Sequence, residues 1–128
     1  MIKLKEEQHI LLKEYQELLD TVEEAFEYIV ESFTNLEKTE SDRLLLDIFY
    51  ALPQIASVNV QLSQLFKEHS SVGKVLAVFD AVAEKAELVV ENFQNLERKQ
   101  QIIRQELYPA FVSWSVMIQQ KFKPYTQS

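Results

Sequence analysis

The stretch IVESFTNLEK at residues 29–38 recurs in nearly the same letters as VVENFQNLER at residues 89–98. At an offset of sixty, six positions are identical: Val30/Val90, Glu31/Glu91, Phe33/Phe93, Asn35/Asn95, Leu36/Leu96 and Glu37/Glu97. A second match, at an offset of fifty-six, places LPQIASVNVQLSQLF at residues 52–66 on YPAFVSWSVMIQQKF at residues 108–122. Two related segments that recur in the same order predict a tandem duplication.

The apolar residues around both stretches recur every three or four positions, which is the pattern of one face of an α-helix. The first such stripe predicts a helix over about residues 2–38 and includes Leu4, Leu11, Tyr15, Leu18, Val22, Ala25, Ile29, Phe33 and Leu36. A corresponding stripe from Val75 to Leu96 predicts another helix, with Ser70 or Ser71 as its N-cap.

Two further stripes predict two more helices. One runs from Leu44 to Phe66 and follows the capping oxygens of Thr39, Ser41 and Asp42, and the other runs from Ile103 to Phe122. The stripe that ends at Leu96 and the stripe that begins at Ile103 are out of phase on any straight helix, so we expect a break near residues 97–101. Proline lacks an amide donor, and we therefore expect Pro53 and Pro109 each to kink a helix or to mark a restart.

These patterns together predict an all-α fold, an up-and-down four-helix bundle built from two tandem αα-hairpin repeats. We place the repeats at about residues 12–69 and 71–123, within a single domain over residues 1–128. A single Gly and three Pro provide few tight turns for a β-fold, and 47% apolar residues are enough for one core. One hairpin has an apolar face with no cover, whereas two hairpins packed together bury both faces.

Charge and composition limit the partners of the chain. The net charge is −7, and residues 1–64 hold thirteen Asp and Glu against five Lys and Arg. Such a surface repels phosphate backbones, so we expect no nucleic-acid binding. The absence of Cys and of any apolar run of membrane-spanning length predicts a soluble cytoplasmic protein that does not enter a membrane.

The acidic residues form two rows that repeat between the halves. Each row has spacings of four, three and four and falls opposite the apolar stripe of its helix, so we expect solvated ridges rather than a metal site. The first row is Asp20, Glu24, Glu27 and Glu31, and these residues align with Asp80, Glu84, Glu87 and Glu91 of the second row. Without Cys, a glycine-flanked Ser or a glycine-rich loop, we expect no catalytic, cofactor or metal site and no enzymatic activity.

One acidic pattern provides an enzymatic alternative. Glu23, Glu24 and Glu27 spell E-E-x-x-E, and Glu37 and Glu40 follow one turn apart. This is similar to the magnesium-binding pattern of the all-α MazG-like nucleotide pyrophosphatases, in which the second pair reads E-x-x-D, whereas position 40 here is Glu. The resemblance implies that these acids would hold Mg²⁺ against a nucleoside triphosphate.

A second apolar stripe on the proline-containing helices is the most informative feature. Its residues are Phe49, Ala56 and Val60 on one helix and Tyr108, Val112 and Val116 on the other, and the last two members of each set are equivalent in the repeat. The stripe could simply wrap around the core of the bundle, or it could form a homodimer seam or a groove for a partner. We therefore predict an adaptor or chaperone-like protein that binds a protein partner or associates with itself.

Overall fold

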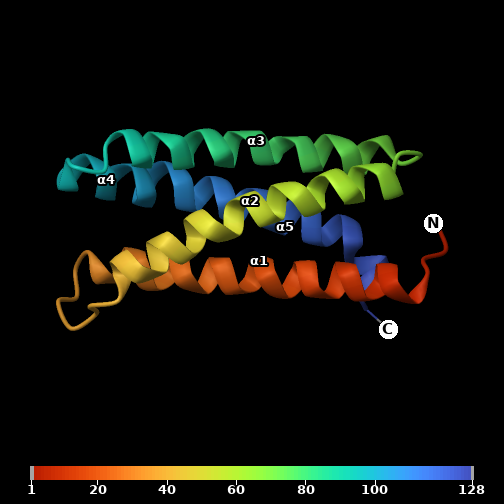
Figure 1. Ribbon diagram of the computed structural model, residues 1–128, viewed down its shortest axis with the longest axis horizontal. Coiled ribbons are helices and arrows are strands. Elements are labelled where there is room, and N and C mark those ends of the chain that lie inside the picture. Colours follow the sequence, from red (N-terminus) through yellow and green to blue (C-terminus); the bar gives the residue numbers. More distant parts are fainter. Residues whose placement is uncertain (1, 128) are drawn as a thin grey trace.

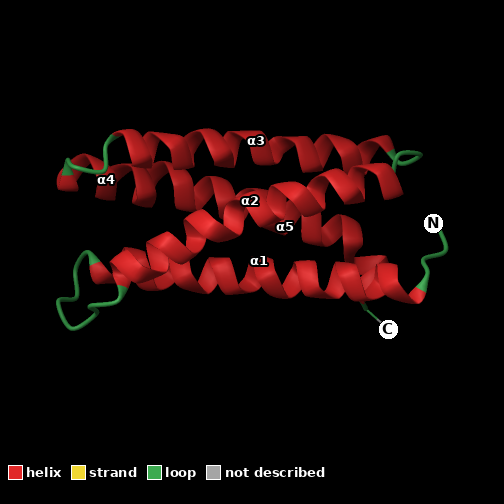
Figure 2. Ribbon diagram, in the orientation of Figure 1, coloured by secondary structure: helices red, strands yellow, loops and turns green. Residues whose placement is uncertain are grey.

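The computed structural model describes residues 2–127 as four long helical rods joined by short loops (Figure 1, Figure 2). The first three rods are α1 (Glu6–Ser32), α2 (Ser41–Leu65) and α3 (Ser70–Glu91). The fourth rod consists of α4 (Leu96–Ile102), the π-helical segment η1 (Ile103–Leu107) and α5 (Tyr108–Thr126), which follow each other without a loop. Over residues 2–127 the structure contains no strand.

The rods alternate in direction along the chain. The α1–α2 and α3–α4 loops lie at one end of the molecule, and the α2–α3 loop lies at the other end with both termini (Figure 1). Both α1 and α3 pack against α2 and α5, so that α1 and α3 are diagonal to each other. The prediction of an all-α, up-and-down four-helix bundle is therefore confirmed.

The buried positions of α1 and α3 follow the offset of sixty. Five of the six buried residues of α1 fall on buried residues of α3, namely Leu12/Val72, Leu19/Phe79, Val22/Val82, Phe26/Ala86 and Ile29/Val89. This agreement concerns burial alone, and the tandem duplication stays a prediction.

Trp114 of α5 joins three helices at the centre of the core. Its ring centroid lies 4.6 Å from that of Phe79 on α3 and 6.5 Å from that of Tyr15 on α1. Its indole Nε1 donates a hydrogen bond of 3.1 Å to the carbonyl oxygen of Val75 on α3. Because Trp114 is fully buried, this bond also satisfies a donor that water cannot reach.

Helix α1 is shorter than predicted at both ends. It begins at Glu6 instead of residue 2, and residues 2–5 are not helical. There Leu4 is buried in the core, and the amide of Ile2 donates to the phenolic oxygen of Tyr125 at 3.3 Å. The start of the chain thus covers the open end of the bundle.

Each repeated decapeptide runs past the end of its helix, which corrects our prediction that Leu36 and Leu96 continue the stripes of α1 and α3. Helices α1 and α3 end at Ser32 and Glu91, and the two leucines are 94% and 62% exposed. Asparagine favours such ends because its side chain bonds to nearby amides. Asn35 accepts from the amide of Glu37 at 3.0 Å, and Asn95 accepts from the amide of Arg98 at 3.1 Å, which caps α4.

The break before the last rod lies at residues 92–95, a few residues before the predicted 97–101. A second irregularity, which we did not predict, lies inside the rod at η1. The amide of Tyr108 donates to the carbonyl oxygen of Ile103, a wide turn that adds one residue to the helix. Pro109 follows this turn directly, whereas Pro53 lies inside α2, which continues past it without a break.

Candidate functional site

Three of the six predicted partner-binding residues line a groove between α2 and α3. Phe49, Ala56 and Val60 follow each other at spacings of seven and four, which places them on one face of α2. Phe49 is half-buried, and the other two are exposed. Opposite them, α3 presents a wall that includes Phe79 and Ala83.

The groove consists of two hollows that share Ala56 and Phe79. The first has a volume of about 480 Å³, and its apolar lining is Phe49, Leu52, Pro53 and Ala56 from α2 and Phe79, Ala83, Ala86 and Val90 from α3. The second has a volume of about 300 Å³ and continues along both helices; it adds Asn59, Val60, Ser63, Gly73, Leu76, Ala77 and Asp80. We call these two hollows together the α2–α3 groove.

Small side chains and the path of α2 keep the groove open. Ala56, Ala83 and Ala86 occupy positions where larger side chains would fill the space between the helices, and a Cβ added at Gly73 would meet nothing within 4 Å. In Figure 1, α2 crosses the molecule from the end of α1 toward the end of α3. It is accordingly packed more loosely against α3 than against α1.

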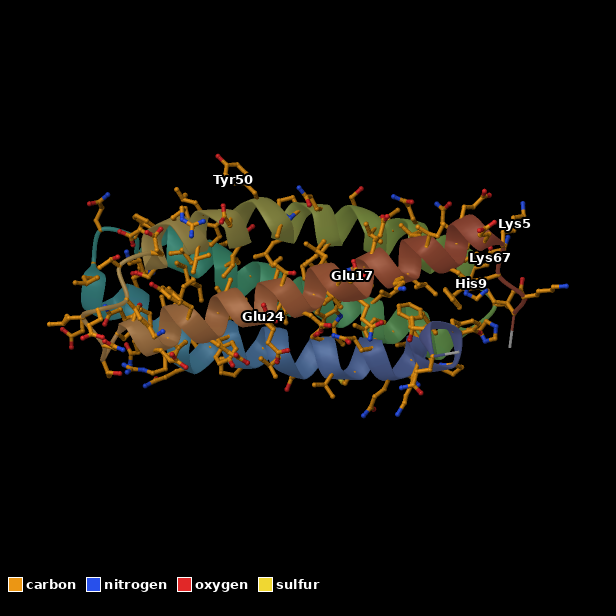
Figure 3. All side chains as sticks on the ribbon, turned by 90° about the horizontal axis from the view of Figure 1, so that it is seen from below. Lys5, His9, Glu17, Glu24, Tyr50 and Lys67 are labelled. Carbon is orange, nitrogen blue, oxygen red and sulfur yellow. The ribbon has the colours of Figure 1, made fainter. Side chains whose placement is uncertain are left out.

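The two edges of the groove differ in charge. Along α3 runs the acid row, which consists of Asp80, Glu84, Glu87 and Glu91; all four are exposed. Within residues 2–127, none of the four forms an ion pair. The edge along α2 is uncharged from residue 48 to residue 65, and beside it Tyr50 projects away from the bundle (Figure 3).

The other three predicted residues lie on the opposite side of the bundle, where α5 faces α1. The ring of Tyr108 packs on Phe26 of α1 with centroids 5.6 Å apart, and Val112 is half-buried. Val116 is exposed and lines a separate hollow of about 330 Å³ with Gln16 and Glu23 of α1. The structure therefore does not bring the six residues together into one surface.

Two acidic groups on the side where α5 faces α1 have raised pKa values. Burial raises the pKa of the Glu23 carboxyl, and the negative charges of Glu27, Asp20 and Glu24 raise it further. Burial also raises the pKa of the Tyr108 phenol, with smaller contributions from Glu27 and Glu23. The charged form of Glu23 is therefore destabilised at this position.

The five acids of the MazG-like pattern point in different directions. Glu23 faces α5, whereas Glu24 lines a hollow between α1 and α2. Glu37 lies in the α1–α2 loop, and Glu40, just before α2, accepts from Arg43 Nε at 2.7 Å. Among residues 2–127, no group of three or more His, Asp or Glu is placed to hold a metal ion, so the geometry adds no support to this alternative.

The α3 wall of the groove was missed by the sequence reasoning. We assigned Phe79 and Ala86 to the core stripe and did not interpret the alanines as an opening. The run AVAEKA at residues 81–86 was the available signal, because alanines between larger apolar residues leave space beside a neighbouring helix.

No helix within residues 2–127 combines the length and the apolar character that a membrane span requires.

Comparison with known proteins places the chain in a family. No solved structure matches it. The chain is 31% identical over 121 residues to "Uncharacterized protein YvzG" of Bacillus subtilis (strain 168), a match that covers 93% of this chain and 94% of that protein. Residues 10–117, which include both walls of the α2–α3 groove, match the family model described as "Domain of unknown function (DUF8042)". The chain therefore belongs to this family.

Proposed function

We propose that this protein is a non-enzymatic, cytoplasmic helical-bundle protein, adaptor or chaperone-like, that binds a protein partner in the α2–α3 groove. The observation that carries the proposal is a continuous, largely apolar groove whose lining includes the small side chains of Ala56, Ala83 and Ala86. A soluble bundle normally fills such a space with larger side chains, so an open one needs cover from another molecule.

The lining favours a protein over a small ligand. Small-molecule sites combine apolar walls with several convergent polar groups that fix orientation. In the larger hollow the charged lining residues are Glu87 and Glu91, both on the α3 edge. A long, shallow, apolar channel between two helices instead resembles the grooves that receive a helix of a partner.

Photo-crosslinking from two matched positions tests the proposal. Val60 in the groove and Val116 on the opposite side of the bundle align in the predicted repeat, and their exposed fractions are 60% and 51%. We expect a photoreactive phenylalanine analogue at position 60 to form one discrete adduct in living cells, and the analogue at position 116 to form none.

A blocking variant completes the test. Ala56 is exposed and lines both hollows of the groove. Ala56→Glu should therefore leave the fold intact but abolish the adduct from position 60. No adduct from position 60, or identical adducts from both positions, would exclude the groove as the binding site. An adduct of twice the mass of the chain would identify a second copy as the partner.

A further inference from the structure

We propose, on the basis of the function proposed above, that the occupant of the α2–α3 groove is an amphipathic helix with an apolar face and a row of Lys or Arg on the flank that meets α3. The shape of the groove favours a helical occupant, and the acid row favours positive charge on the flank of that helix that meets α3.

The dimensions fit one helix of about four turns. From Phe49 to Ser63 the α2 wall covers about 21 Å at ~1.5 Å per residue. Such a helix would place apolar side chains at spacings of three, four and seven in the two hollows. The small side chains of Ala56, Ala83 and Ala86 let its backbone approach closely.

The charge of the groove is one-sided, and this fixes how the helix is rotated about its axis. The acid row lies on the α3 edge of the groove. On α2 the exposed polar side chains include the amides of Gln54 and Gln61 and the hydroxyl of Ser57. Cations on the α3 flank would therefore meet carboxylates, and cations on the α2 flank would not. Complementary charge of this kind contributes to specificity and to the rate of association.

The last residue of the acid row lies at an electrostatically unfavourable position in its own helix. Glu91 is the last residue of α3, and the last turn of this helix contains no basic residue. The negative end of the helix dipole disfavours a carboxylate at this position. A partner cation would relieve that repulsion.

A second copy of the chain is a poorer occupant. Two grooves that face each other would bring uncharged α2 edges and acid rows together, without a cation for either row. With a net charge of −7, the two copies would also repel each other at long range.

The experiment uses two labelled eighteen-residue peptides of the same helical apolar face, one with lysines and one with glutamates along one flank. Fluorescence anisotropy measures their binding to the full chain at low and at physiological salt. We expect the lysine peptide to bind, with an affinity that falls as salt increases, and the glutamate peptide to bind at least about tenfold more weakly.

Two charge-reversed variants distinguish the acid row from the overall charge. Glu87→Lys/Glu91→Lys changes the groove, and Glu27→Lys/Glu31→Lys makes the equivalent change on α1, with the same spacing and the same net charge. All four residues are exposed, so both variants should fold, which circular dichroism checks. We expect the first variant to weaken lysine-peptide binding about tenfold and the second less than about twofold.

Each other outcome overturns the inference in a distinct way. Equal weakening by both variants would mean that the peptide responds to net charge alone. Equal binding of both peptides, abolished by Ala56→Glu, would leave the groove as a binding site but exclude the charge preference. No peptide binding together with a persistent adduct from position 60 would exclude a helical occupant while the proposed function stands. A dimer in analytical ultracentrifugation that Ala56→Glu dissociates would make a second copy the occupant.

Discussion

Tyr15 and Asn59 form a buried hydrogen bond that links α1 to α2. The phenolic oxygen of Tyr15 donates to Asn59 Oδ1 at 2.6 Å, and both residues lie in the core. Burial raises the pKa of the Tyr15 phenol well above its ordinary value, because the phenolate would lose its hydration. Tyr15 therefore remains a hydrogen-bond donor at every physiological pH.

We expect Tyr15→Phe to lower the free energy of unfolding by about 1–3 kcal/mol, because Asn59 Oδ1 would lose its donor at a buried position. Urea unfolding followed by circular dichroism measures this change. The double variant Tyr15→Phe/Asn59→Leu replaces both polar partners and should recover most of the loss. If the double variant were as unstable as the sum of the two single variants, the bond would not couple the two residues.

Glu23 provides a prediction on pH. Its folded-state pKa is raised, so the folded protein binds the proton more tightly than the unfolded chain does. Stability from this group is therefore fully present below the ordinary carboxyl pKa and is lost as pH increases through the raised value. We expect Glu23→Gln to increase Tm near about pH 7 and to leave it unchanged near about pH 3, where the carboxyl is neutral in both states. A gain in Tm of the same size at both pH values would contradict this assignment.

At the scale of elements, the two prolines occupy different surroundings. Before Pro109, the wide turn of η1 moves a hydrogen bond from the usual fourth residue to the fifth, between Tyr108 and Ile103. This leaves room for the proline ring, which would otherwise clash with the preceding turn. Pro53 has no such turn before it and lies within α2.

We therefore expect Pro53→Ala to raise the free energy of unfolding by about 1–3 kcal/mol, because α2 regains an amide donor and loses a clash. Pro109→Ala is the matched control and should raise it less, because η1 already accommodates the ring. Thermal and urea unfolding of both variants give the comparison. A loss of stability in Pro53→Ala would show that the path of α2 past α3 depends on the proline.

At the scale of the whole molecule, one core joins all four rods. Trp114 contacts Tyr15 and Phe79, while Phe66 of the α2–α3 loop packs on Phe122 of α5 with centroids 5.1 Å apart. Because no rod has a core of its own, the bundle should unfold as one cooperative unit.

We expect urea unfolding to give the same midpoint by far-ultraviolet circular dichroism, which reports all the helices, and by the fluorescence of Trp114, the single tryptophan. Coincident transitions are the mark of two-state unfolding. An earlier transition by circular dichroism alone would mean that the loosely packed α2 separates from the bundle before the core opens.

The sequence by itself determined the helices and their order. The spacing of apolar residues reports which face of a helix is buried, and this property is local, so the stripes of α1 and α3 predict the buried face of each helix. Tyr15, Val22 and Ile29 of the predicted α1 stripe are buried, whereas Leu11, Leu18 and Ala25 lie beside them and are half-buried. Helix ends were less predictable. The apolar pattern continues to Leu36 and Leu96, but the helices end earlier, and the side chains of Asn35 and Asn95 accept hydrogen bonds from nearby amides there.

Only the tertiary structure decided which surfaces remain open. Phe49, Ala56 and Val60 were predictable as a second stripe, but their partners Phe79, Ala83 and Ala86 come from another helix. The separation of Val60 from Val116 onto opposite sides likewise depends on which helices become neighbours. The width of a groove is set by how closely two helices approach and cross, and this distance results from packing throughout the core rather than from the pattern of either helix.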